Sequence, residues 1–84
     1  MKAYYMTFRS VTLAQQAEMA LARAGISCAL QRTPRWMETQ GCGYCLRIPY
    51  ARGADAVTVL RREQATYRKI YLKLENGTLE EVQL

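Results

Sequence analysis

Hydrophobic and polar residues alternate with a period of two in four segments of the chain, a pattern typical of half-buried β-strands. In residues 3–8 the apolar face consists of Tyr4, Met6 and Phe8. The other three alternations place their apolar residues at Cys28 and Leu30 in residues 26–31, at Tyr44, Leu46 and Ile48 in residues 44–49, and at Ile70, Leu72 and Leu74 in residues 67–75. The pattern therefore predicts four strands that share one apolar core.

Two segments between these strands have the three- and four-residue spacing of an amphipathic helix. Residues 12–24 contain no Gly or Pro; Ser10 before them can cap a helix, and Gly25 after them is typical of a helix end. The small apolar face of this helix would consist of Ala14, Ala17, Leu21 and Ala24. Residues 53–64 predict a second helix that starts near Asp55, and the residues it would bury are Ala56, Val57 and Leu60.

The end of the chain predicts a β-hairpin. Asn76-Gly77 is the strongest hairpin signal in the sequence, because both residues tolerate the positive φ angles of a two-residue turn. Residues 78–84 would then form an edge strand. A two-residue turn matches an apolar pair and an opposite-charge pair across the hairpin, namely Leu74 with Leu79 and Lys73 with Glu80.

The predicted order of elements is strand, helix, strand, strand, helix, strand, which is the ferredoxin-like split β-α-β pattern of an α+β protein. Residues 1–75 would form this single ferredoxin-like domain, and residues 76–84 would be a C-terminal hairpin strand of the same domain. Both helices would cover one face of an antiparallel sheet. The strand phases leave the other face open, and its residues would be Tyr5, Cys45, Arg47, Tyr71 and Lys73.

Composition narrows the function only slightly. A chain of 84 residues, half of them hydrophobic, has room for one small core. Its formal net charge of +5 favours an acidic partner such as nucleic acid or an acidic protein surface, although a small domain also carries surplus Lys and Arg without one. We expect a cytoplasmic protein, because the N-terminus has no apolar signal segment. Three cysteines, an odd number, do not predict a disulfide framework there.

The candidate chemistry lies in the connection over residues 32–43 and at the start of the strand after it. This connection has no apolar periodicity, contains a Pro34-Arg35 turn, and leads into Cys42 and Cys45 in a C-x-x-C spacing. Long connections in compact domains are often functional. Because the chain has no histidine and no cluster of acids with catalytic spacing, any chemistry is expected to use these thiols.

A series of short motifs follows in order along the chain: Phe8-Arg9-Ser10, Ala14, Ala17-Glu18, Ala24-Gly25-Ile26, Pro34-Arg35 and Cys42-Gly43. In this order the chain resembles the small bacterial domains of the selenium/sulfur carrier protein-like family. That pattern has Phe-x-Ser opening a helix, Ala-Glu inside it, Ala-Gly-Ile closing it, a Pro-Arg turn, and Cys-Gly before the third strand. Residues 36–40 replace a serine-rich run of the family, and the family pattern does not require Cys45.

The resemblance implies a cytoplasmic carrier that holds sulfur or selenium on Cys42 and exchanges it with donor and acceptor proteins. A persulfide carrier needs an accessible thiolate, room for a bulky S–S group, and positive charge nearby. Gly41 and Gly43 would give the room, and Arg35 and Arg47 the charge. The plain alternative is that these glycines and Cys42 form an ordinary turn. We expect no cofactor and no metal, and at most a sulfurtransferase-like or thiol-redox activity.

The three thiols are predicted to have different roles. Cys28 would be a core side chain that reacts slowly. Cys42 would be the carrier, because its thiolate would be the most populated near neutral pH. Cys45 would be a resolving thiol that attacks the persulfide on Cys42 and releases its cargo.

Other functions stay open at this point. A thioredoxin-type dithiol needs a helix N-terminus after the first cysteine, and a strand follows instead. A zinc site needs four ligands, so two well-spaced thiols would require a symmetric dimer. The alternative of a different class is a non-catalytic binding module that uses the open sheet face. It would stack RNA bases on the exposed sheet aromatics, or it would bind a protein partner or a second copy through Tyr5 and Tyr71. We favour a protein partner or self-association over nucleic acid at this face.

Overall fold

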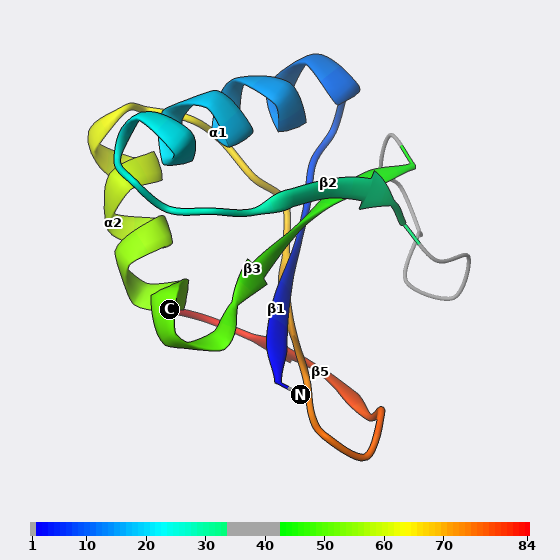
Figure 1. Ribbon diagram of the computed structural model, residues 1–84. Coiled ribbons are helices and arrows are strands. Elements are labelled where there is room, and N and C mark those ends of the chain that lie inside the picture. Colours follow the sequence, from blue (N-terminus) through cyan, green and yellow to red (C-terminus); the bar gives the residue numbers. More distant parts are fainter. Residues whose placement is uncertain (1, 34–42) are drawn as a thin grey trace.

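The computed structural model describes residues 2–33 and 43–84 (Figure 1). In chain order the elements are β1 (Ala3–Thr7), α1 (Val11–Arg23), β2 (Ala29–Arg32), β3 (Tyr44–Pro49), the short 3-10 helix η1 (Tyr50–Arg52), α2 (Gly53–Arg62), β4 (Ile70–Lys73) and β5 (Leu79–Val82). The strands form one antiparallel sheet, and both helices lie on the same face of it (Figure 1). The predicted α+β class is confirmed.

The strand order in the sheet is β2-β3-β1-β4-β5. β1 therefore lies at the centre, between β3 and β4, and β5 extends the sheet beyond β4. This fifth strand distinguishes the order from that of a four-stranded ferredoxin-like sheet. The structure thus supports the class and the two-layer arrangement, with a larger sheet than the ferredoxin-like pattern contains.

The main core lies between the sheet and the two helices. The predicted strand phases are confirmed for Met6, Phe8, Leu46, Ile48 and Ile70, which enter this core and are at most 2% exposed. The helices contribute Ala14, Ala17, Ala20 and Leu21 from α1, and Ala56, Val57, Val59 and Leu60 from α2. Small alanines on α1 let this helix approach the sheet closely.

The predicted capping of α1 is also confirmed. The backbone N–H of Leu13 donates to the Ser10 hydroxyl oxygen at 3.2 Å, which satisfies one of the free amides in the first turn. Gly25 follows the helix with a φ of +79°, in the left-handed region that glycine adopts without steric cost. α1 can therefore begin and end on local signals alone.

The start of α2 depends on a close contact with β1. A Cβ atom on Gly53 would overlap the ring of Tyr4. The Tyr4 ring in turn stacks on Tyr50 of η1, with ring centroids 5.5 Å apart and planes 14° apart. Gly53 is thus needed for packing, because its own φ of −61° is ordinary for a helix.

The predicted register of the C-terminal hairpin is wrong by one residue. Lys73 pairs with Leu79, and the amide of Leu74 donates to the carbonyl of Thr78 at 2.8 Å. The loop therefore contains three residues, and only Gly77 has a positive φ, of +88°, whereas a two-residue turn requires it of Asn76 as well. Because a shift of one residue exchanges the faces of a strand, Leu79 lies on the face away from the helices.

Candidate thiol site

The two ends of the β2–β3 connection are held side by side. Arg32 pairs with Tyr44 across the strands, and its guanidinium lies 5.3 Å from the centre of the Tyr44 ring. One step further, the amide of Thr33 donates to the carbonyl of Gly43 at 2.8 Å. Gly43 is buried and has a φ of +85°, so a side chain at this position would be strained. The sequence analysis expected Gly43 to give room, and the positive φ is a separate reason for glycine at this position.

Three of the six predicted site residues lie outside the described part of the chain: Arg35, Gly41 and Cys42. The described residues fix where the polypeptide re-enters the sheet, since Cys42 is bonded to Gly43 and Gly43 precedes β3 directly. The described part of the candidate site is therefore the place where the connection joins the sheet, at the end of the β2–β3 pair.

Cys45 is on β3, on the face away from the helices, as its phase predicted, but its exposed fraction is 0%. It belongs to a second, smaller apolar cluster with Ala3 and Tyr5, against which Tyr71 and Leu79 pack. The prediction that Tyr5 and Cys45 are exposed on an open face is therefore wrong. Neighbouring side chains on the same sheet can bury a small residue without any covering helix.

Arg47 lies on the same face as Cys45, two residues further along β3. It lines a pocket with Lys2, Pro49, Tyr50, Ala51 and Glu75 at the end of β3 that is opposite to Gly43. Arg47 is four residue steps along the strand from Gly43, so their backbones are about 13 Å apart. The described geometry thus brings Arg47 to Tyr5, its partner in the sheet register, and not to Gly43.

Cys28 precedes β2 and packs, half-buried, against the main core, as predicted for a core side chain. Burial raises the pKa of its thiol, and the carboxylate of Glu18 adds to this effect. A raised pKa leaves less thiolate near neutral pH, so Cys28 is a poor nucleophile.

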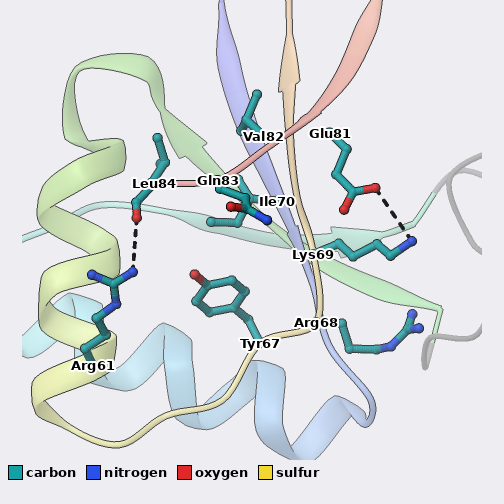
Figure 2. A pocket seen from close by; sticks show the side chains of 9 residues that line it. All are labelled: Arg61, Tyr67, Arg68, Lys69, Ile70, Glu81, Val82, Gln83 and Leu84. Atoms are coloured by element: carbon teal, nitrogen blue, oxygen red, sulfur yellow. Dashed lines mark hydrogen bonds and ion pairs between the residues drawn. The ribbon is translucent and has the colours of Figure 1, made fainter.

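A further pocket, which no sequence motif predicted, lies between the end of α2 and the β4–β5 edge (Figure 2). Its volume is about 310 Å³, and the hydroxyl of Tyr67 points into it. Two of its cations already have partners: Arg61 donates to the Leu84 carbonyl at 3.1 Å, and Lys69 lies 3.7 Å from Glu81. The lining comes from segments far apart in sequence, which explains why no motif predicted it.

The part of the chain that the structure describes contains neither a metal-binding cluster nor a membrane-spanning helix. Residues 2–33 and 43–84 contain no group of three or more His, Cys, Asp or Glu side chains that could hold a metal ion. None of the helices in these ranges is both long enough and apolar enough to cross a bilayer.

A protein-family model described as "Putative Se/S carrier protein-like" matches residues 3–72. The chain belongs to this family. The match begins at the first residue of β1 and ends within β4, so it includes the β2–β3 connection with Cys42 and excludes β5. No curated protein and no solved structure gave a match. The resemblance that the sequence motifs indicated is confirmed.

Proposed function

We propose that this protein carries sulfur or selenium on Cys42, as a persulfide or perselenide, and passes it to an acceptor protein. Family membership supports the kind of cargo. The observation that carries the choice of residue is the contrast among the thiols. Cys45 is fully buried, and Cys28 is half-buried with a raised pKa, so neither suits a sulfur-carrying thiolate. Cys42 is the remaining thiol of the chain.

Loading and transfer are redox-neutral exchanges. In loading, the Cys42 thiolate attacks the terminal sulfur of a donor persulfide; a new S–S bond forms on Cys42, the donor's S–S bond breaks, and the donor leaves as a thiolate. In transfer, an acceptor thiolate attacks the terminal sulfur on Cys42 and returns Cys42 to its thiolate form. Gly41 and Gly43 would leave space for the added sulfur, and Arg35 would hold its negative charge. Donor and acceptor proteins are therefore the partners we expect, in the reducing cytoplasm.

Cys45 and Arg47 have conditional roles in this scheme. For Cys45 to resolve the persulfide, its thiolate must attack the Cys42 sulfur, forming a Cys42–Cys45 disulfide and releasing hydrosulfide. A thiol reductant must then reduce the disulfide before another cycle. Because Cys45 is buried with Ala3 and Tyr5, this route first requires the start of β3 to open. Arg47 would reach the cargo only if its side chain turned from its pocket toward Cys45.

The test is the intact mass of the protein after incubation with a cysteine desulfurase and cysteine, and in parallel with inorganic polysulfide. We expect wild-type protein to gain the mass of sulfur atoms that a thiol reductant removes. Cys42→Ser should abolish this gain. Cys28→Ser is the matched control, since it removes one thiol elsewhere and should load normally. Cys45→Ser should load normally and release its sulfur more slowly. Full loading of Cys42→Ser would overturn the proposal.

A further inference from the structure

The face of the sheet away from α1 and α2, called the open sheet face below, contains an apolar centre bordered by charges. Among the described residues no helix lies on it (Figure 1). Its centre is the small cluster of Ala3, Tyr5 and Cys45, with Tyr71 and Leu79 packed against it. A surface that mixes aromatic rings with charged side chains in this way is typical of protein interfaces.

The strand register arranges one row of side chains across all five strands of the open sheet face. From β2 to β5 the row reads Ala29, Arg47, Tyr5, Tyr71 and Glu81. Two tyrosines lie in the middle, a cation lies one strand to one side, and an anion lies one strand to the other. Reversing the row therefore places opposite charges against each other and aromatic rings against aromatic rings.

We propose that the open sheet face is a dimerisation surface that binds a second copy of this chain. The two-fold axis would run parallel to the strands, between Tyr5 and Tyr71. Tyr5, which is 9% exposed, would then lie opposite the partner's half-buried Tyr71, and Arg47 opposite the partner's Glu81. In such an isologous contact each pair forms twice. Sheets that pack face to face are about 10 Å apart, a gap that Tyr and Arg side chains can fill from both sides.

The charges on this face are consistent with a second copy as the occupant. Within the described residues no carboxylate forms an ion pair with Arg47; Glu75, the carboxylate that lines its pocket, is beyond ion-pair distance. The present partner of Glu81 is Lys69 at 3.7 Å, and both side chains are substantially exposed, so this pair is weak. Glu81 can therefore take a second cation.

Geometry also limits how tight the dimer is. Five strands about 4.8 Å apart and four to six residues long span on the order of 350 Å² of flat sheet. A standard interface buries about 800 Å² from each partner, so we expect a weak, concentration-dependent dimer. In the next row Lys73 would lie opposite the partner's Ala3, with no anion facing its ammonium group, which weakens the dimer further.

Sedimentation equilibrium over a wide concentration range tests the proposal. We expect wild-type protein to dimerise reversibly. Arg47→Glu opposes two carboxylates, and Glu81→Arg opposes two guanidinium groups, so each single variant should dimerise about tenfold more weakly or worse, because every substitution acts twice. An equimolar mixture of the two variants should recover dimers, since both kinds of pair are then restored in the heterodimer.

Lys73→Glu is the matched control, because it changes the net charge as much as Arg47→Glu and affects the same face. A mixture of Lys73→Glu with Glu81→Arg should contain no more dimer than the two variants form separately. Thermal unfolding of each variant alone checks that it is folded. Wild-type protein that stays monomeric throughout would overturn the proposal, as would dimers that the two charge reversals leave unchanged. Monomers that bind RNA with a steep salt dependence would show nucleic acid as the occupant instead. None of these results depends on sulfur loading of Cys42.

Discussion

The two faces of this sheet differ in what buries them. On the helix side, the strand residues are covered by α1 and α2 and contribute to one continuous core. On the open sheet face, Ala3, Tyr5 and Cys45 are buried by side chains of neighbouring strands, and charged residues lie directly beside them. The helices α1 and α2 cover the first face, whereas the buried residues of the second face are covered only by side chains of the sheet itself.

This difference shows that strand phase and exposure are separate properties. The period-two alternation correctly assigns Cys45 to the face away from the helices, yet Cys45 is as inaccessible as Leu46 beside it. A functional role that depends on accessibility therefore cannot be assigned from phase alone. For the thiols the consequence is direct, because the burial of Cys45 argues against any role that needs an exposed thiol at this position.

The largest effect should come from truncation on the helix side. Phe8 is fully buried in the main core between the sheet and the helices, so Phe8→Ala should lower the free energy of unfolding by about 3–5 kcal/mol. Tyr71 on the open sheet face is only half-buried, and Tyr71→Ala should cost clearly less. Chemical denaturation of both variants measures the difference. Equal losses would mean that the open sheet face supports the fold as much as the helix side does.

A smaller effect is expected where β1 contacts α2. Gly53→Ala would gain up to about 1 kcal/mol from helix propensity, but the new methyl group must displace the Tyr4 ring, which typically costs about 1–3 kcal/mol. We expect a net loss of stability in thermal or chemical unfolding. In a Tyr4→Ala background the same substitution should be neutral or stabilising. If Gly53→Ala is equally harmful in both backgrounds, the clash with Tyr4 is not its cause.

The sequence predicts those features of this fold that have local causes. Ser10 and Gly25 mark α1, and the alternations of residues 3–8 and 44–49 assign the helix face correctly. The hairpin register fails because Asn76-Gly77 fits more than one turn, and only the backbone decides whether Asn76 adopts a positive φ. The predictions for the exposure of Cys45 and the position of Arg47 fail for another reason. Both depend on neighbours in other strands, which spacing along the chain does not contain.

The site was predictable to a similar extent. The order of short motifs identified the family, and with it Cys42 as the candidate carrier. Gly43 was expected to give room, and its left-handed backbone gives a stricter reason for glycine. The placement of Arg47 beside Tyr5 and Glu75, at the other end of β3, required the sheet register.

The smallest effect is a difference in reactivity between the two described thiols. It involves no measurable change in stability near neutral pH. Because burial and Glu18 raise the pKa of Cys28, its alkylation should reach half its maximal rate at a higher pH than that of an unperturbed cysteine. As pH rises past the ordinary thiol pKa, the unfolded chain loses its Cys28 proton first, so this group reduces stability only at alkaline pH. Cys45 should react more slowly than Cys28 at every pH, because its sulfur becomes accessible only when the cluster opens. Iodoacetamide labelling with peptide mapping measures both rates, and Glu18→Gln should speed only Cys28. Labelling of Cys45 as fast as Cys28 would show that the open sheet face is not sealed by its own side chains.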